Sequence, residues 1–275
     1  MSTGKARRLA RIFRQGKSVI IPMDHGVSAG PLPGLGNMRR ALAAVLAGGA
    51  DAIVGHRLLF RELDKLPAAA PGGPAEAGAL LHLSASTDLS PSPNRKALTA
   101  SVEDALRLGA DGVSIHVNIG DPDEASMLAD FGRVARAAAD WGMPLLAMLY
   151  ARGPKIKNGF DPDIVAHCAR IGAELGADAV KVLYTGDMQS FRRVTEGCAV
   201  PVLVAGGPQT DSPAGFFRML GEALQAGAAG VSIGRNVFQH PRPERMAEAL
   251  RALVHEGQSP EQALARTLDV HTATC

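Results

Sequence analysis

One lysine interrupts an otherwise apolar segment of the chain. Residues 177–187 read Ala-Asp-Ala-Val-Lys-Val-Leu-Tyr-Thr-Gly-Asp, and the lysine is Lys181. A short segment rich in β-branched residues is typical of a strand that is buried on both faces in α/β proteins. Burying a charged ammonium group is costly, and a buried lysine that gives up its proton is a nucleophile. A lysine at the end of a strand, reaching solvent or pairing with a carboxylate, fits the same segment equally well.

The chemistry of Lys181 depends on which way it points, and therefore on the fold. Apolar segments, most of them preceded by a glycine-rich join, are expected to form strands, and alanine-rich segments between them are expected to form helices. The strand segments with their joins are residues 18–23, 47–55, 78–84, 108–116, 141–150, 177–187, 200–206 and 226–234. The helical segments include residues 38–46, 101–107, 125–140, 163–175 and 215–225.

Strands that alternate with helices in this way predict an α/β fold, a single (β/α)8 TIM barrel over residues 1–275. An open doubly wound sheet also alternates, but this many strands in this length favour closure. Residues 1–17 place basic side chains around Leu9 and Ile12, which predicts a basic helix that caps the barrel and runs directly into the first strand. Residues 66–78 are expected to be a surface loop replacing most of the second helix, and residues 154–162 are a candidate for a mobile lid.

The composition argues against several classes of partner. The net charge is only +2, and no basic patch is interleaved with aromatic residues, so nucleic acid is not an expected partner. No apolar run approaches the ~18 residues of a membrane span, and the N-terminus has no apolar signal region. The cysteines, Cys168, Cys198 and Cys275, have no metal or disulfide spacing. We therefore expect a soluble, reduced, cytoplasmic protein that binds neither nucleic acid nor membrane.

In TIM barrels the active site is formed at the carboxyl ends of the strands. Because inward and outward side chains alternate along a barrel strand, Val180 and Val182 are expected to face the helices and Lys181 the interior. The residues that follow or end the predicted strands are the candidates for its neighbours, and they are Asp24, His25, His56, Arg57, His82, Ser84, Ser86, His116, Asn118, Tyr150, Arg152, Lys155, Tyr184, Gly206, Gly207, Gly234, Arg235 and Asn236.

An interior lysine near a carboxylate and a phenol has the parts needed for imine chemistry. The amine of Lys181 adds to a ketone, and the resulting iminium draws electrons from the adjacent carbon. Asp24 and Tyr150 are the groups available to move the protons.

Glycines after the last two strands indicate a phosphate site. Gly206, Gly207 and Gly234 let backbone N–H groups approach a phosphate, and Arg235 would add a charged contact. Ordinary turns between a strand and a helix use the same glycines. Asp24 and the candidate histidines invite a metal ion, but no two of these histidines share a short metal-binding spacing, so we expect no metal site.

Three motifs resemble those of the archaeal-type class I aldolases, which are Schiff-base enzymes. Residues 23–31, Met-Asp-His-Gly-Val-Ser-Ala-Gly-Pro, resemble the first-strand motif of that family. Residues 181–187 resemble its Schiff-base motif, and residues 201–208 resemble its phosphate motif. The resemblance covers nearly the whole chain.

Within this family the chain departs from the fructose-bisphosphate aldolases at Val27, Ser28 and Met148. It resembles instead the branch that contains 2-amino-3,7-dideoxy-D-threo-hept-6-ulosonate synthase and 2-amino-4,5-dihydroxy-6-oxo-7-(phosphooxy)heptanoate synthase. The segments that carry this closer resemblance are residues 82–91, 112–118 and 143–150.

The resemblance implies that a ketone donor forms an imine on Lys181 and that no cofactor is needed. It implies Tyr150 as proton donor or relay, and Asp24 as the group that positions hydroxyls and shuttles protons. Substrate and phosphate binding would fall to His25, Gly26, Val27, Ser28, His116, Arg152, Gly206, Gly207, Gly234 and Arg235. Family members form homo-oligomers, often decamers, so we expect a homo-oligomer.

The implied partners are a small phosphorylated ketone and an amino-acid aldehyde. Direct addition of dihydroxyacetone phosphate to L-aspartate 4-semialdehyde is favoured over a transaldolase-type exchange from a six-carbon diulose phosphate. Fructose-bisphosphate cleavage, a thiolase-like acyl transfer and a non-enzymatic phosphate-binding barrel stay open. The residue that binds the carboxylate of the aldehyde also stays open, with Arg57, Arg152, Lys155 and Lys157 as candidates.

Overall fold

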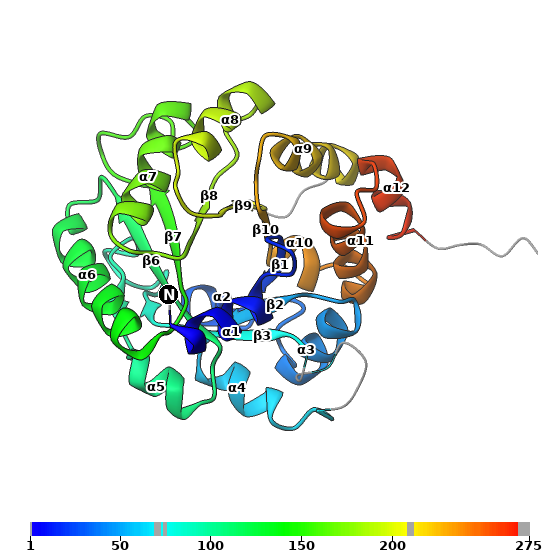
Figure 1. Cartoon of the computed structure of the whole chain (residues 1–275), viewed down its shortest axis with the longest axis horizontal. Coiled ribbons are helices and arrows are strands. Elements are labelled where there is room, and N and C mark those ends of the chain that lie inside the picture. Colours follow the sequence, from blue (N-terminus) through cyan, green and yellow to red (C-terminus); the bar gives the residue numbers. More distant parts are fainter. Residues whose placement is uncertain (1, 69–72, 74–75, 208–211, 269–275) are drawn as a thin grey trace, which may run out of the picture.

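A closed ring of parallel strands surrounded by helices makes up the computed structural model, which describes residues 2–68, 73, 76–207 and 212–268 (Figure 1). The strands follow the order β1-β10-β9-β8-β7-β6-β3-β2 around the ring. The predicted (β/α)8 TIM barrel is therefore confirmed. The strand bounds are β1 (Ser18–Pro22), β2 (Ala52–Gly55), β3 (Gly78–His82), β6 (Gly112–Ile119), β7 (Leu145–Ala151), β8 (Ala179–Val182), β9 (Val202–Ala205) and β10 (Gly230–Ser232).

Helices cover the outside of the ring, and several begin at a polar residue that caps the first turn. In α5, for example, Ser101 and Asp104 form a reciprocal capping box. The predicted loop after α4 lies partly outside the described residues, at 69–72 and 74–75. The outer helices are α3 (Met38–Ala47), α4 (Arg57–Leu63), α5 (Val102–Arg107), α6 (Glu124–Trp141), α7 (Pro162–Glu174), α8 (Met188–Glu196), α9 (Pro213–Gln225), α11 (Pro243–His255) and α12 (Pro260–Ala265).

Two apolar layers share the strands, because alternate side chains point to opposite faces. The outer layer packs strands against helices and contains Val180 and Val182. The inner layer fills the barrel and contains Ala179 and Leu183. Lys181 lies between Val180 and Val182 in β8, so the alternation turns its side chain into the barrel as predicted.

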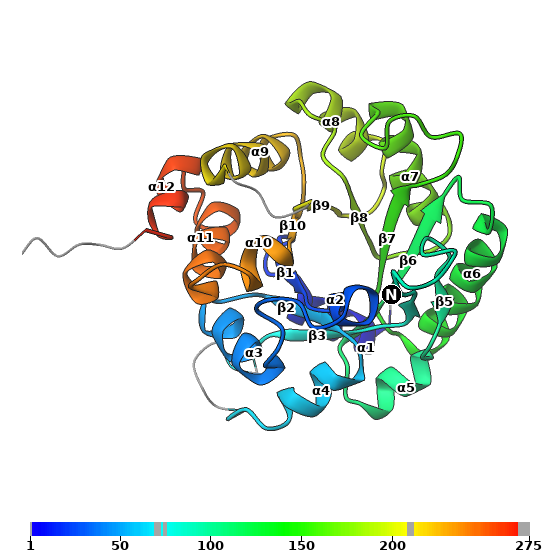
Figure 2. The ribbon, with the colours of Figure 1, turned by 180° about the vertical axis from the view of Figure 1, so that it is seen from behind.

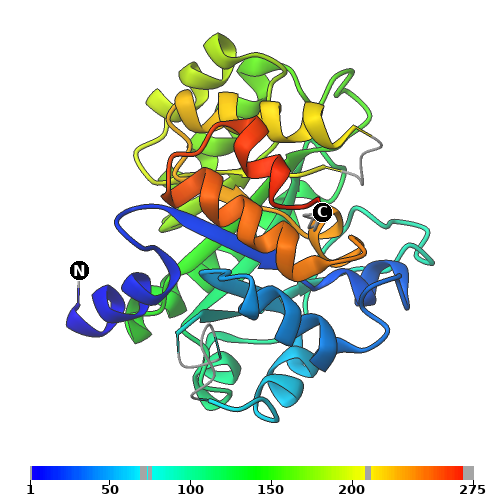
Figure 3. The same ribbon diagram turned by 90° about the vertical axis from the view of Figure 1, so that its right-hand side faces the viewer.

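The N-terminal helix α1 (Thr3–Ile12) is shorter than predicted and does not run directly into β1. Arg14 and Lys17 exchange backbone hydrogen bonds of 2.8 and 3.0 Å across a tight turn that reverses the chain. The reversal is needed because Ile12 enters the inner layer at the amino end of the barrel, where the partly buried Phe13 packs beside it. The helix thus lies at the amino end of the ring, as the side view shows (Figure 3).

Aspartates in three of the glycine-rich joins hold the N-terminal segment in place. Each carboxylate accepts a backbone N–H from the start of the preceding barrel strand and pairs with one cation of the N-terminal segment. These pairs are Asp51 with Val19 N (2.7 Å) and Arg14 (3.0 Å), Asp111 with Ala79 N (3.0 Å) and Arg11 (2.7 Å), and Asp178 with Leu145 N (2.8 Å) and Lys5 (2.8 Å). We call these residues the N-terminal clamp.

The opposite face carries short elements that the sequence did not predict. They are the helices α2 (His25–Ala29) and α10 (Arg235–Phe238) and the hairpin of β4 (Ser84–Ala85) with β5 (Ala97–Leu98). Figure 2 looks onto this face, where the carboxyl ends of the strands lie. In the described part of the chain no helix is long and apolar enough to cross a membrane. Cys168 and Cys198 are free thiols, and Cys275 lies outside the described residues.

Candidate active site

Lys181 lies deep in the barrel and is 8% exposed. It pairs in register with Met148 of β7 and Leu203 of β9, whose side chains belong to the inner apolar layer. Within the described residues its amine makes no hydrogen bond or ion pair, although it acts electrostatically on Asp24 and His82. An amine held among apolar side chains without a fixed partner is free to react with a ligand.

Asp24 follows β1 and faces three histidines. Its Oδ2 lies 3.8 Å from His82 Nε2, and its Oδ1 lies 3.7 Å from His25 Nδ1. His56 packs edge-on against His82, with ring centroids 5.3 Å apart. Asp24 Oδ1 and His25 Nδ1 are both buried and have no hydrogen-bond partner in the described part of the chain. Buried polar atoms normally find partners, so these two atoms are candidates to hydrogen-bond a polar ligand.

The charge state of this corner follows from burial. Burial would raise the pKa of Asp24, but His82, His25, Lys181 and His56 together hold it well below its usual range. Burial lowers the pKa of His82 to about 4, against the opposing effect of Asp24. Burial lowers the pKa of His25 and His56 as well. At neutral pH the carboxylate is therefore charged while the imidazoles around it are neutral.

A second polar group lies at the ends of β6 and β7. His116 Nε2 donates to Asn118 Oδ1 at 2.9 Å, because an amide oxygen only accepts. Asn118 pairs in register with Tyr150, whose ring meets the His116 ring edge-on at 5.0 Å. The guanidinium of Arg152 lies 5.1 Å from the centre of the Tyr150 ring. Tyr150 is thus held in the inner layer, one strand away from Lys181.

The ends of β9 and β10 meet through side-chain hydrogen bonds to glycine carbonyls. Arg235 Nη2 donates to Gly207 O and Asn236 Nδ2 donates to Gly206 O, each at 3.2 Å. Gly207 has φ +68°, and no atom lies within 4 Å of where its Cβ would be. A Cβ on Gly234 would lie 2.6 Å from His25 Cε1, so only glycine lets α2 approach β10 so closely. The motif residue Pro208 lies outside the described residues.

Not every candidate residue faces this site. Tyr184 belongs to the outer layer, where its hydroxyl donates to Glu222 Oε2 at 2.7 Å. Arg57 is paired with Asp104 of α5 at 3.0 Å. Gly26 and Val27 are exposed on α2, and the partly buried Ser28 accepts a hydrogen bond from Asp88 N.

The remaining candidates lie on the loop after β7 or within the hairpin. Lys155 and Lys157 are exposed in that loop, and Ser84 Oγ accepts from His116 N at 3.1 Å. Mobility of residues 154–162 stays a prediction.

Lys96 is a site residue that the sequence analysis missed. Burial and then the charge of Arg152 lower its pKa, while Asp88 and Asp24 oppose that change. It also acts on the pKa values of His82 and His116. The hairpin that follows β3 brings this lysine to the mouth, and no sequence pattern predicted the geometry of that hairpin.

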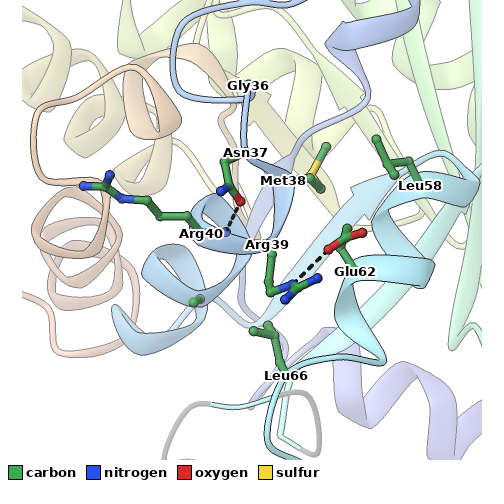
Figure 4. Close-up of a pocket in the computed structure, with 9 residues that line it drawn as sticks. Gly36, Asn37, Met38, Arg39, Arg40, Leu58, Glu62 and Leu66 are labelled. Carbon is green, nitrogen blue, oxygen red and sulfur yellow. Dashed lines mark hydrogen bonds and ion pairs between the residues drawn. The ribbon is translucent and has the colours of Figure 1, made fainter.

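Hollows lie both beside the barrel mouth and on the outer surface. One of about 280 Å³ is lined by His56, His82 and Val27, next to Asp24. Another, of about 610 Å³, lies on the outer surface between α3 and α4 (Figure 4). There Arg39 is paired with Glu62. In the described part of the chain no group of three or more His, Cys, Asp or Glu has the arrangement of a metal site.

The barrel with one buried inward lysine at its carboxyl end is the architecture of a Schiff-base aldolase. A family model described as DeoC/LacD family aldolase matches residues 18–240, and the chain belongs to that family. It is a class I aldolase, and the predicted resemblance is confirmed.

Curated relatives agree with this class. The chain is 42% identical over 236 residues to a 2-amino-4,5-dihydroxy-6-oxo-7-(phosphonooxy)heptanoate synthase of Streptomyces griseus, covering 86% of this chain and 84% of the relative. It is 42% identical over 272 residues to a 2-amino-3,7-dideoxy-D-threo-hept-6-ulosonate synthase of Halobacterium salinarum, covering 96% of each.

A solved structure is also similar. It is an archaeal fructose-1,6-bisphosphate aldolase with its catalytic lysine covalently bound to the carbinolamine intermediate of the substrate. The TM-score is 0.81 at 33% identity, and the match covers 91% of this chain and 99% of that one.

Proposed function

We propose that this enzyme joins dihydroxyacetone phosphate to L-aspartate 4-semialdehyde and releases a seven-carbon amino keto acid phosphate. The observation that carries the proposal is the buried amine of Lys181, which lacks a partner within the described residues and lies among Met148, Leu203 and the charged Asp24. Two relatives at 42% identity are named for seven-carbon amino acid products, which supports the choice of acceptor.

Catalysis begins when the amine of Lys181 adds to the C2 carbonyl of the donor. Loss of water from the carbinolamine gives an iminium, which draws electrons from C3. A proton leaves C3, and an enamine forms. The enamine carbon attacks the aldehyde carbon of the acceptor, and the new alkoxide takes up a proton. Water then hydrolyses the iminium, which releases the product and restores the amine.

Tyr150 and Asp24 are the proposed proton carriers. Tyr150 lies on the strand next to β8, and its ring contacts the His116 ring and the guanidinium of Arg152. Asp24 stays ionised at neutral pH, and its Oδ1 has no hydrogen-bond partner in the described part of the chain, so it can accept from a donor hydroxyl. The neighbouring imidazoles are neutral there and accept or donate single hydrogen bonds.

The donor phosphate is proposed to bind where β9 and β10 end. Gly206, Gly207 and Gly234 leave their backbone close to the mouth, and Arg235 supplies a guanidinium held against Gly207 O. His25 and the short helix α2, including Gly26, Val27 and Ser28, lie next to this end of the mouth. With its phosphate bound here, the donor can extend its carbonyl group towards Lys181, because β8 is the strand next to β9.

Reductive trapping tests the imine. Borohydride added with dihydroxyacetone phosphate should attach the reduced donor to the peptide that contains Lys181, as read by mass mapping. Lys181→Met should lose both the adduct and all turnover while keeping the barrel, as read by circular dichroism. An adduct on Lys155 or Lys157, or activity in Lys181→Met, contradicts the mechanism.

Acceptor and donor assays separate the alternatives. A seven-carbon product from dihydroxyacetone phosphate and L-aspartate 4-semialdehyde supports direct addition. Product formed only from a six-carbon diulose phosphate supports the transaldolase-type exchange. A preference for glyceraldehyde 3-phosphate as acceptor supports fructose-bisphosphate aldolase. Activity that withstands EDTA is expected, because no proposed step uses a metal ion.

A further inference from the structure

Lys96 is a cation at the barrel mouth with no part in the mechanism above. It lies in the loop between β4 and β5, and its side chain is half-buried. Its ammonium group donates to Ser86 Oγ and, at 3.3 Å, to Pro93 O. The loop itself therefore holds the charge in one place, instead of leaving it to sample solvent.

Hydrogen bonds at two points fasten this loop across the mouth. Asn118 Nδ2 donates to Asn94 O at 2.5 Å, which ties the loop to the end of β6. Asp88 N donates to Ser28 O at 2.9 Å, which ties it to α2. In the ring of strands, β3 and β6 lie opposite β9 and β10. Lys96 is thus placed on the side of the mouth that faces away from Arg235.

His116 is linked to the surroundings of two cations, Lys96 and Arg152. Asn118 binds His116 and also the carbonyl of Asn94, two residues before Lys96. The Tyr150 ring contacts both the His116 ring and the Arg152 guanidinium. Burial and then these two cations lower the pKa of His116, so both charges act on one ring. Arg152 directly follows β7, and its guanidinium lies over the Tyr150 ring. Two neighbouring cations repel each other, and an anion bound between them offsets that repulsion.

We propose that Lys96 and Arg152 bind the carboxylate of the acceptor aldehyde. This inference rests on the proposed function and adds a second anion site, which is separated from the phosphate site by β8, because β7 and β9 lie on either side of that strand. An acceptor anchored here would present its aldehyde towards the enamine in the middle of the mouth. The side chain of Arg57 is already paired with Asp104. Arg152, Lys155 and Lys157 are all exposed, but the guanidinium of Arg152 lies over the Tyr150 ring.

The test compares a charged with an uncharged acceptor. In Lys96→Met the KM for L-aspartate 4-semialdehyde should rise ~10–100-fold, the usual effect of losing one charge-assisted hydrogen bond. The kcat should change little, and Lys96→Arg should recover most of the affinity. Turnover of propanal, which has no carboxylate, should be unaffected by either substitution. Arg152→Gln should repeat the effect on KM.

Arg95→Met is the matched control, because Arg95 is the neighbouring cation of the same loop and points to Asp123 at 3.9 Å. It should leave both acceptors unaffected. Equal losses with propanal and with the semialdehyde in Lys96→Met would show that Lys96 only holds the loop, and would overturn the inference. So would an unchanged KM in both Lys96→Met and Arg152→Gln.

Trapping of the donor separates this inference from the proposed function. Lys96→Met should still form the borohydride-reduced adduct with dihydroxyacetone phosphate, which also shows that the variant is folded. A wild-type enzyme that traps no donor overturns the proposed function and this inference with it. A wild-type enzyme that traps the donor, with variants that bind the semialdehyde normally, overturns this inference alone.

Discussion

Tyr150 and Tyr184 leave the barrel wall on opposite faces. Tyr150 faces the interior beside His116, whereas the hydroxyl of Tyr184 donates to Glu222 of α9 on the outside. They are the two tyrosines of the chain, and both are largely buried. Each tyrosine is therefore a control for the other. Tyr150→Phe removes a hydroxyl from the candidate active site, whereas Tyr184→Phe removes one from the contact between the barrel wall and α9.

Tyr150→Phe should lower kcat by ~10²–10⁴-fold, the usual contribution of a positioned proton donor. The donor adduct at Lys181 should still form. Tyr184→Phe should keep kcat and lower the free energy of unfolding by ~1–3 kcal/mol, because the carboxylate of Glu222 loses its donor. Steady-state kinetics and urea unfolding measure the two effects. Equal losses of kcat in both variants contradict the assignment of Tyr150.

Arg235→Met should raise the KM for dihydroxyacetone phosphate by ~10–100-fold, because a phosphate loses a charge-assisted hydrogen bond. The KM for the acceptor aldehyde should stay within twofold. Arg218→Met, which changes an exposed arginine of α9, serves as the control. Initial rates at varied donor concentration give both constants. If Arg235→Met has the same KM as wild type, the phosphate lies elsewhere.

The neutral histidines of the mouth should make the fold sensitive to mild acid. The pKa of His82 is about 4 in the folded chain and near 6.5 when unfolded. Between these values the unfolded chain binds a proton that the folded chain does not. Stability is therefore full above pH 6.5 and falls as the pH drops towards 4, by roughly 3 kcal/mol for this group.

Urea unfolding at pH 7, 6 and 5 measures this loss, and His82→Gln should make the dependence shallower. A wild-type free energy of unfolding that stays constant over that range contradicts the burial of His82 as a neutral imidazole.

The N-terminal clamp should contribute to stability through its carboxylates more than through its cations. Asp178→Ala should lower the free energy of unfolding by ~1–3 kcal/mol, because Leu145 N–H loses its acceptor and Lys5 loses its ion pair. Lys5→Met should cost less, and a double-mutant cycle gives the coupling between them. Arg7→Ala, at an exposed position of α1, should lie within ~0.5 kcal/mol of wild type. A larger loss from Lys5→Met than from Asp178→Ala would contradict this ranking.

The strands and the direction of Lys181 were predictable because both follow from local alternation. The same alternation turns Tyr184 outward. Tyr184 was wrongly included among the candidates because only its position at a strand end was considered, and not the direction of its side chain. Lys96 was not predictable, because its place depends on a hairpin held by Asn118 and Ser28 across the mouth. The ion pair of Asp111 in its glycine-rich join was not predictable either, since its partners, Ala79 and Arg11, are distant in the sequence.

The closed end of the barrel has a kinetic consequence. Ile12 and Phe13 pack into the amino end, so within the described residues the open route to Lys181 is the mouth at the carboxyl ends of the strands. In the proposed reaction the ketone bonds to the deeper residue, and the aldehyde lies above it. The ketone must therefore bind first, and the product leaves by the route through which both substrates came. We expect an ordered sequence of addition, with the product competing with the ketone for the empty enzyme.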